Sequence, residues 1–583
     1  MKSLVNGCWI GLVLLVISCA GPSVSEKDKL FDIIASNEAF EKKEFSSLTE
    51  NYNRLPDMSE LAIKKRTDFT RDIISQLEAI DKNQLSFEDQ ITCALFKFVQ
   101  EDKVAQYDLN GYLNPILADD GFHISFAFTP AYFSFTSKQD YLNYIGVLES
   151  FPKYVDQHIS LMRKGLEIGM VQPKIILDGY EVTYDNHIVD DLEESLFYKP
   201  FLNLPNQLSE EEKAELLEKG QQAVRNGAIA GYRQFSDFMT NEFVPNTRTS
   251  IGASDLPNGD EFYRQRIKYY TTLELSPDSI HQLGLQEVAR IKSEMESIIE
   301  EVGFEGSFAE FLDFLRTDPQ FYAETPDQLL KEAAWISKSM DGKMPKLFGK
   351  LPRQPYTVKP VPDHLAPKYT GGRYSPGSLD ANQPGEYWVN TYALESRPLY
   401  VLEALSFHEA VPGHHLQEAL SRELTRLPDF RQSLYLSVFG EGWGLYSEFL
   451  GLEAGFYTDP YSNFGRLTYE MWRACRLVVD TGIHAKGWTR DQVMKYMAAN
   501  TALSLHEIRT ETDRYISWPA QALSYKIGEL KIKALRKKAE EQLGEKFDIR
   551  AFHDLILSQG TVTLEIMDEM VEQYIEDKLT NKD

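Results

Sequence analysis

The segment HEAVPGHH, residues 408–415, constrains the local fold more than any other part of the chain. A proline inside a helix cannot donate its backbone hydrogen bond, and its ring crowds the carbonyl four residues earlier, while glycine tolerates nearly any backbone angle. The pair Pro412–Gly413 therefore predicts a two-residue bulge in an otherwise helical segment. With two residues removed from the count, His414 stands at position i+4 from His408.

That spacing is the one that lets two imidazoles share a divalent metal ion. Side chains at i and i+4 lie on one helix face about 6 Å apart, whereas in a straight helix His408 and His414 would be about 9 Å apart along the axis. Only 11 of 583 residues are histidines, yet three of them fall within these eight positions, beside Glu409. We therefore predict a zinc site with Glu409 as general base. The alternative is a buried helix whose histidines make ordinary hydrogen bonds. His415 is expected to contact a metal-ligating side chain or the substrate.

A third ligand is expected on a downstream helix, in the segment FGEGWGLYSE. Glu441 follows an apolar run, and its neighbours Gly440 and Gly442 permit the close approach of another backbone. Glu448 is two helical turns further on the same face, so it can ligate the metal in place of Glu441 or hydrogen-bond a ligand imidazole. The alternative is a surface pair of glutamates on an amphipathic helix.

Three motifs together carry a family resemblance: HEAVPGHHLQ, EGWGLYSE and RYISWPAQALSYKIG. The chain resembles the bacterial domain-of-unknown-function 885 family of zinc peptidases, often secreted as lipoproteins, over most of its mature length. The resemblance implies a mainly helical fold akin to the gluzincin peptidases, with His408, His414 and Glu441 on Zn²⁺ and Glu409 as base. It implies no particular substrate.

The N-terminus predicts a lipid anchor. A basic start precedes the apolar run 9–17, and the sequence VISC ends at Cys19, so residues 1–18 read as a lipoprotein signal peptide, Cys19 as the acylated residue and residues 19–26 as a tether. A cleaved secretory signal and an uncleaved anchor are the alternatives. Ala20 favours the outer membrane of the bacterial cell envelope, with the protein facing the periplasm or the exterior. Membrane contact is expected only through the lipid.

Composition restricts the partners. The net charge of −27 and the lack of a basic stripe argue against nucleic acid. After the signal peptide and Cys19, only Cys93 and Cys475 remain, too few for a disulfide framework. No linker or repeat divides the chain, so we expect a mainly α fold, large and metallopeptidase-like. Residues 27–345 form its helical scaffold subdomain and 346–583 its metal-binding catalytic subdomain, and the oligomeric state stays open.

Periodicity predicts helices over 61–80, 87–99, 139–166 and 210–240. Residues 346–397 differ, because they are rich in proline and glycine and include the β-like segments 356–358 and 387–390. In gluzincins an edge strand above the metal pairs with the substrate, so the resemblance makes 387–391 the substrate strand, with contacts from Tyr387, Val389 and Asn390. A structural hairpin is the alternative.

Hydrolysis also needs a group that stabilises the oxyanion. The candidates are His484, which Asp480 can orient, together with Arg514, Tyr515 and Tyr525, and Tyr525 is also a candidate for substrate contact. The alternative for each is a role in helix packing. The sequence thus predicts a zinc-dependent hydrolase that cleaves short peptides. A hydrolase of a non-peptide envelope amide or ester, and a non-catalytic lipoprotein binding module, are the rival interpretations.

Overall fold

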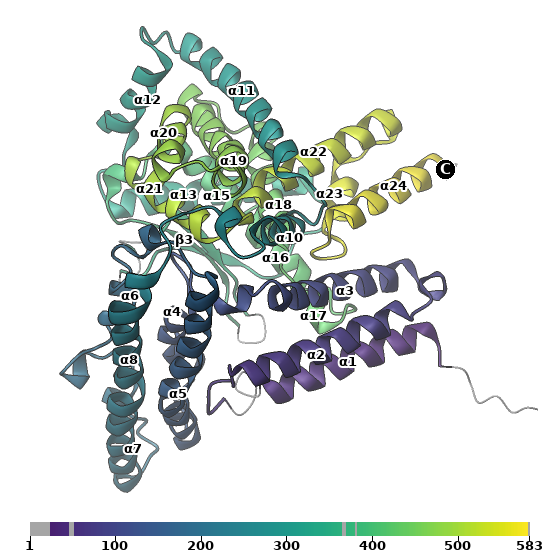
Figure 1. Ribbon diagram of the computed structural model, residues 1–583. Coiled ribbons are helices and arrows are strands. Elements are labelled where there is room, and N and C mark those ends of the chain that lie inside the picture. Colours follow the sequence, from purple (N-terminus) through teal and green to yellow (C-terminus); the bar gives the residue numbers. More distant parts are fainter. Residues whose placement is uncertain (1–23, 46–51, 364–365, 367–368, 379–381, 581–583) are drawn as a thin grey trace, which may run out of the picture.

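The structure is a computed structural model that describes residues 24–45, 52–363, 366, 369–378 and 382–580 (Figure 1). The predicted signal peptide, Cys19 and the first residues of the predicted tether lie outside the described residues. The fold is mainly helical, as predicted, and carries one small sheet. Among the described helices, none combines the length and the apolar run that a bilayer crossing requires.

The helices fall into two sets along the chain. The N-terminal helices are α1 (Glu26–Glu44), α2 (Glu60–Glu78), α3 (Phe87–Asp108), α4 (Phe122–Ala127), α5 (Lys138–Ile168), α6 (Val182–Asp185), α7 (Glu210–Ala223), α8 (Ala230–Phe238), α9 (Val244–Asn246), α10 (Gly259–Thr271), α11 (Pro277–Glu301), α12 (Phe308–Thr317), α13 (Pro326–Asp341) and α14 (Met344–Leu347). The C-terminal helices are α15 (Leu402–Glu409), α16 (His414–Arg422), α17 (Asp429–Ser433), α18 (Ser437–Glu453), α19 (Pro460–Lys486), α20 (Arg490–Asn500), α21 (Leu505–Ser517), α22 (Ser524–Leu543), α23 (Ile549–Leu557) and α24 (Leu564–Thr580).

The four predicted helical stretches are confirmed by α2, α3, α5 and the pair α7–α8, which a π-helical turn over Val224–Ile229 joins. Local chemistry explains where several of them begin. The Ser209 hydroxyl accepts a hydrogen bond from the backbone N–H of Glu212, and the Glu212 carboxylate accepts one from the backbone N–H of Ser209, so α7 starts with a capping box. Ser276 caps α11, and Pro277 occupies its first turn.

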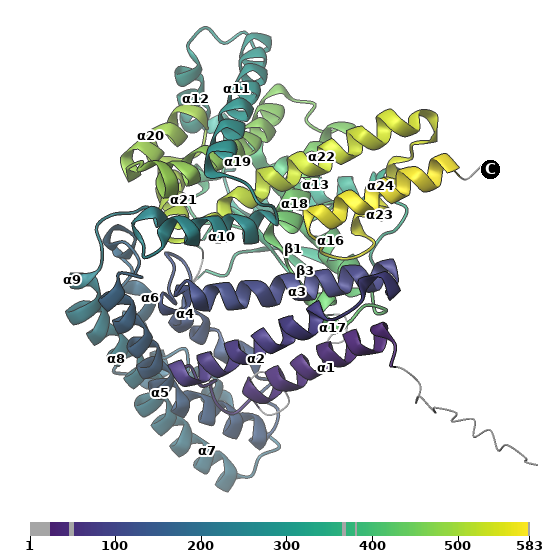
Figure 2. The same ribbon diagram turned by 45° about the vertical axis from the view of Figure 1, so that its right-hand side comes forward.

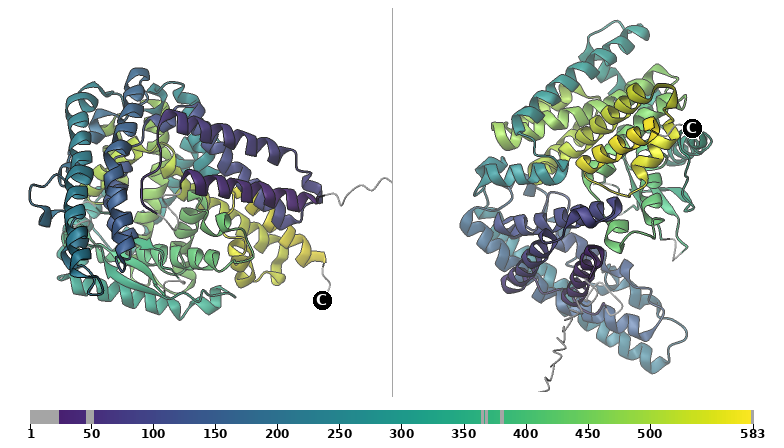
Figure 3. Two further views of the ribbon diagram at one scale, coloured as in Figure 1. Left: turned by 90° about the horizontal axis from the view of Figure 1, so that it is seen from below. Right: turned by 90° about the vertical axis from the view of Figure 1, so that its right-hand side faces the viewer.

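Helices from distant parts of the sequence pack together. Helices α1, α2 and α3 lie side by side, and α5, α7 and α8 form a separate group at the lower end of the molecule (Figures 1 and 2). Seen from below, that group stands along one side and the C-terminal helices α22–α24 lie toward the other (Figure 3). Helix α11 packs along α19, so side chains from both sides of residue 345 belong to one hydrophobic core.

Helices α18 and α22 cross at a pair of glycines. A Cβ atom on Gly442 would lie 2.5 Å from the Cα of Gly528, and one on Gly528 would lie 2.1 Å from the carbonyl of Val438. Neither position accepts a side chain at this crossing distance. The close contact fixes α18, which carries Glu441 and Glu448, against the C-terminal part of the fold.

The sheet corrects the prediction of the substrate strand. It comprises β1 (Tyr356–Pro360), β2 (Gly372–Ser375) and β3 (Gly385–Val389) in the order β1-β3-β2, with β1 parallel and β2 antiparallel to β3. Because β3 is the central strand, its backbone groups are paired on both sides and are closed to a substrate. The edge strand beside α15 is β2.

The three residues predicted for substrate contact on β3 are part of the packing. Tyr387, Val389 and Asn390 are all buried. The hydroxyl of Tyr387 lies 3.3 Å from Ser406 Oγ, and the amide of Asn390 donates to backbone carbonyls of the preceding loop, among them that of Ala366 at 2.9 Å. These contacts brace the loop and the sheet against α15. The structure does not support the backbone pairing with a substrate that was predicted for this strand, although Val389 and Asn390 also line a cavity between α15 and α19.

Candidate metal centre

The two histidines come from consecutive helices separated by a tight break. Helix α15 ends at Glu409 and α16 begins at His414, with a cis peptide before Pro412. A Cβ on Gly413 would lie 1.9 Å from the carbonyl oxygen of His408, so only glycine fits there. The carbonyl of Pro412 accepts a hydrogen bond of 2.8 Å from the Trp443 indole. The interruption therefore occurs where Pro412 and Gly413 predict it.

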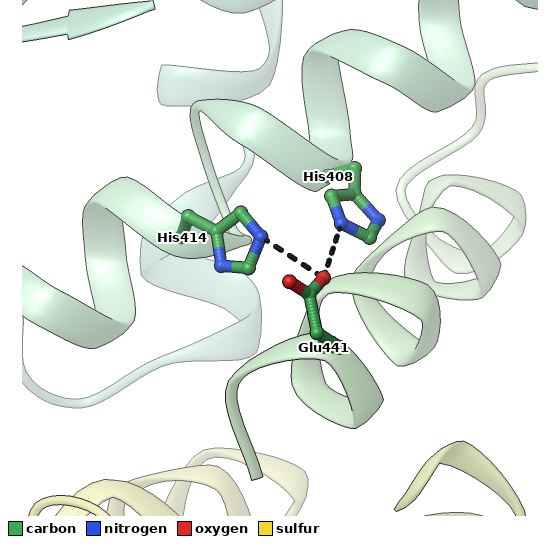
Figure 4. Close-up of side chains that lie close together, drawn as sticks. All are labelled: His408, His414 and Glu441. Carbon is green, nitrogen blue, oxygen red and sulfur yellow. Dashed lines mark hydrogen bonds and ion pairs between the residues drawn. The ribbon is translucent and has the colours of Figure 1, made fainter. Parts of the chain in front are cut away.

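Across this break, His408 and His414 meet Glu441 of α18 (Figure 4). Oε2 of Glu441 lies 3.3 Å from Nε2 of His408 and 3.4 Å from Nε2 of His414. Two ligands held about 2.0–2.1 Å from a tetrahedral zinc ion are roughly 3.3–3.4 Å apart, so the contacts match the edges of such a site. The ligand atoms of these three residues, hereafter the His/Glu cluster, all lie within 4.8 Å of one another.

A glycine and a second glutamate on α18 set the orientation of His408. A Cβ on Gly444 would lie 2.7–3.0 Å from atoms of the His408 ring, so the ring lies directly on the helix backbone. Oε1 of Glu448, on the same face of α18, is 2.8 Å from Nδ1 of His408 and 3.6 Å from the guanidinium of Arg473. This pairing leaves Nε2 directed at Glu441, which is the carboxylate–histidine arrangement found behind metal ligands.

Within the His/Glu cluster, the charged neighbours of each residue shift its pKa in the direction opposite to burial. Burial lowers the pKa of His408, but the hydrogen bonds to Glu441 and Glu448 outweigh it and raise that pKa to about 9. Burial likewise opposes the charge of His414, and Glu441 raises its pKa. Burial would raise the pKa of Glu441, yet the two histidines hold it well below its usual range. A divalent cation would replace these protons as the partner of the carboxylate.

The residue expected to act as base is held by the edge strand. Glu409 is the last residue of α15 and is 8% exposed. Its Oε2 accepts a 2.7 Å hydrogen bond from the backbone N–H of Tyr374 on β2. Since alternate backbone groups of an edge strand point away from the sheet, this bond marks the free edge of β2 as the surface nearest the base. The sequence did not single out Tyr374.

His415 is not part of the His/Glu cluster. Its Nδ1 lies 3.1 Å from the hydroxyl of Tyr374, and its ring centroid is 4.6 Å from that of Tyr356. Burial lowers its pKa to about 4, opposed by a hydrogen bond to the backbone of Gln354. The side chain thus joins α16 to the sheet as a neutral ring, and its effect on a substrate would pass through β2.

Of the residues predicted to stabilise an oxyanion, Tyr525 lies closest to the cluster. Its ring centroid is 6.5 Å from that of His408, and burial followed by the charge of Glu441 raises its pKa. Arg514 lies behind it, donating to Gln521 Oε1 at 2.6 Å. The hydroxyl oxygen of Tyr515 accepts hydrogen bonds from Trp472 and from Arg476, at 2.7 and 2.8 Å. Arg476, which donates to Tyr515, also lies over the Tyr525 ring at 4.3 Å, so Tyr515 is linked to Tyr525 through this guanidinium.

His484 is placed elsewhere. Its Nδ1 accepts a 3.0 Å hydrogen bond from the backbone N–H of Ala253, and its Nε2 is 2.9 Å from the carbonyl of Tyr515. Burial lowers its pKa to about 3. Asp480, expected to orient the ring, instead accepts a 2.6 Å hydrogen bond from the hydroxyl of Tyr263. Both nitrogens of His484 serve the packing of α19, so the structure does not support the predicted oxyanion role.

Tyr435 is a site residue that sequence reasoning missed. Its hydroxyl donates to Oε1 of Glu441 at 3.0 Å, although the residue as a whole is 41% exposed. A Cβ on Gly440 would lie 2.4 Å from the Tyr435 ring, so Gly440 makes room for it. The available signal in the sequence is Gly440, although a glycine there predicts a close backbone contact rather than space for an aromatic ring.

Comparison with known proteins places the chain in a family. The bacterial protein family of unknown function DUF885 matches residues 43–571. The chain belongs to the DUF885 family. A crystal structure described as a candidate lipoprotein from Colwellia psychrerythraea is similar to this DUF885 chain, with 27% identity, a TM-score of 0.87, and coverage of 95% of this chain and all of that one.

A second solved structure shows the same fold at lower identity. It is described as a candidate lipoprotein of unknown function from Shewanella oneidensis, with 18% identity, a TM-score of 0.73, and coverage of 93% of this chain and 99% of that one. No curated protein matches this DUF885 chain. The family thus assigns the fold and leaves the chemistry to be argued from the His/Glu cluster.

Proposed function

We propose that this DUF885 protein is a zinc-dependent hydrolase that cleaves short peptides. The observation that carries the proposal is the His/Glu cluster, whose contacts of 3.3 and 3.4 Å match the ligand spacing of a tetrahedral zinc ion. His408, His414 and Glu441 would hold the ion, which would activate a water molecule and polarise the carbonyl under attack. Three protein ligands leave one position open, as catalytic rather than structural zinc sites do.

Residues around the cluster would supply proton transfer, orientation of the His408 ring and stabilisation of the oxyanion. Glu409 accepts the proton of the attacking water and returns it to the leaving amide nitrogen, while Tyr374 N–H holds one of its oxygens. Glu448 keeps the His408 ring oriented through Nδ1. Tyr435 bonds Glu441 and the Tyr525 ring lies near His408, so these two hydroxyls are our candidates for stabilising the oxyanion.

Access favours an extended, short substrate. His408 and His414 are 2% and 7% exposed, so a folded protein cannot bring a backbone carbonyl to them. The free edge of β2 lies beside Glu409 and supplies backbone groups with which an extended peptide can pair. We therefore assign substrate alignment to β2 in place of the strand 387–391.

The proposal includes the location. The sequence VISC ending at Cys19 is typical of lipid-anchored envelope proteins, and both solved relatives are described as candidate lipoproteins. Attachment at Cys19 would leave the catalytic part free in the periplasm or at the exterior of the outer membrane.

The decisive experiment uses Glu409→Gln in zinc-loaded full-length protein and a peptide library read by mass spectrometry. The variant should keep about one zinc per chain, while kcat falls by roughly a hundredfold or more because the base is lost. Glu403→Gln on the same helix is the matched control, since Glu403 accepts from the backbone of Tyr457. Unchanged turnover in Glu409→Gln, or no library peptide cut by the wild type, contradicts the proposal.

A further inference from the structure

A cavity of about 180 Å³ lies beside the start of β2, between α15, α19 and the segment that precedes α21. Leu402 and Leu405 of α15 form one wall, and Thr468 and Tyr469 of α19 form another. Its size exceeds that of cavities of about 150 Å³ that hold a benzene ring. None of the residues assigned to the metal or to proton transfer lines it.

The cavity is next to the His/Glu cluster along both β2 and α15. Leu405 stands four residues before Glu409, on the same face of α15. Its Cδ2 lies 3.2 Å from where a Cβ on Gly372 would be, so it packs directly under the edge strand. The N–H of Tyr374 donates to Glu409, and Gly371, three residues earlier in the chain, lines the cavity. Extended chain between these two residues spans about 10 Å. A peptide aligned on β2 with its scissile carbonyl at Glu409 would place over the cavity the side chain of a residue about two or three positions from the cleaved bond.

Two hydroxyl groups in the lining are buried and unpartnered. Tyr400 and Thr468 are 4% and 1% exposed, and neither hydroxyl has a hydrogen-bond partner among the described residues. A buried polar group without a partner is costly, and such groups are nearly always paired. Otherwise the wall is largely apolar, with Leu402, Leu405 and Leu503. The lining therefore fits an apolar group that carries a hydrogen-bonding atom.

The charged residues of the lining do not select a charged ligand. The guanidinium of Arg316 is used by backbone carbonyls, those of Leu503 at 3.1 Å and Thr501 at 2.5 Å. Burial raises the pKa of Glu507 to about 7, against the opposing charge of Arg397, so this carboxyl is largely neutral below pH 7. Glu395, the remaining charged residue of the lining, is exposed. The enclosed part of the cavity is thus suited to a neutral side chain.

We infer that this cavity binds the side chain of a substrate residue about two or three positions from the scissile bond, and that it selects an aromatic ring with a hydroxyl group, as in tyrosine. The inference rests on the proposed function and names its substrate class. The ring would pack against the leucines, and its phenol would pair with the buried hydroxyls of Tyr400 and Thr468 once these side chains shift to present them to the cavity. A site built to bond a hydroxyl discriminates strongly against the analogue that lacks it.

The first test measures binding without turnover, using p-cresol and toluene with the zinc-loaded full-length protein. Calorimetry should show p-cresol binding at least about tenfold more tightly than toluene to the wild type, because one or more hydrogen bonds distinguish them. The double variant Tyr400→Phe/Thr468→Val should bind the two equally while still binding toluene. Thr481→Val, a buried threonine on the same helix that bonds His281, should keep the wild-type ratio.

The second test measures kcat/KM on peptides with tyrosine, phenylalanine or alanine at the second and third positions on either side of the cleaved bond. We expect tyrosine to exceed phenylalanine, and alanine to be lower by roughly ten- to two-hundredfold, on one side of the bond. In Tyr400→Phe/Thr468→Val the tyrosine advantage over phenylalanine should disappear, with the preference over alanine retained.

The outcomes separate the two proposals. Equal binding of p-cresol and toluene to the wild type, or cleavage with no preference among the three peptides, overturns the side-chain pocket and leaves the hydrolase standing. Selective binding of p-cresol with no peptide cleaved overturns the peptidase proposal and keeps the phenol site.

Discussion

Among the buried histidines of the described residues, two groups differ in the presence of carboxylates. His123 and His158 lie among aromatic rings near α4 and α5, where His158 stacks on Phe122 with ring centroids 4.1 Å apart. Burial lowers the pKa of both to about 3. In the His/Glu cluster, burial acts in the same direction on His408, but the two glutamates raise its pKa to about 9. Burial by itself makes a neutral packing residue, and buried carboxylates turn the same side chain into a cation or a metal ligand.

The largest expected effect is the loss of metal when a carboxylate of the second group is removed. Glu441→Ala leaves only His408 and His414, and two ligands bind zinc weakly. We expect zinc to fall from about one ion per chain to near zero by elemental analysis. His158→Phe is the control from the first group and should keep its zinc. Full occupancy in Glu441→Ala would mean that another side chain completes the site.

A smaller effect is expected when the carboxylate behind His408 is neutralised. Glu448→Gln weakens the hydrogen bond to Nδ1, and changes in this outer layer typically cost about ten- to a hundredfold in metal affinity. Competition with a chromophoric chelator measures the loss, and circular dichroism checks folding because Arg473 is also a partner.

The variant Glu418→Gln tests whether loss of negative charge alone explains the fall in zinc affinity expected for Glu448→Gln. Glu418 faces the cluster from α16, and the charge of His414 acts on it. It makes no described hydrogen bond to a ligand imidazole. Zinc affinity should change much less in this variant than in Glu448→Gln, and equal losses would attribute the effect to net charge rather than to the hydrogen bond.

The smallest expected effect is the pH dependence that the first group imposes on stability. His158 is neutral in the folded state, with a pKa of about 3, whereas the unfolded chain takes up a proton near pH 6.5. Its stabilising contribution is therefore complete above pH 6.5 and is lost as the pH falls toward 3, by about 1.4 kcal/mol per pH unit. At pH 5 the loss is about 2 kcal/mol.

His158→Phe removes this titration and retains the stack on Phe122. Between pH 7 and pH 5, its melting temperature should fall less than that of the wild type. An identical fall in both proteins would show that His158 is already protonated in the fold, and the contrast between the two groups would break down.

The candidate ligand set is largely a property of the sequence. The break at Pro412 and Gly413 depends on backbone chemistry within a few residues, and so does the capped start of α7. Helical periodicity then places Glu441 and Glu448 on one face of α18. These inferences hold because each depends on contacts between residues close together in the chain, where spacing alone sets the geometry.

Only the tertiary structure decided which strand borders the site and which side chains face it. Strand order depends on contacts between residues far apart in the chain. Strand β1 pairs with one side of β3, and this makes β3 a central strand rather than the edge strand that the sequence predicted. His484 and Tyr435 show the same limit for single residues. The backbone N–H of Ala253 donates to His484, which is therefore a packing residue, whereas the missing side chain at Gly440 leaves room for the Tyr435 ring beside Glu441. The sequence by itself determined which residues can hold a metal, and the packing of distant segments determined what surrounds them, because a side chain's surroundings depend on contacts that no local spacing encodes.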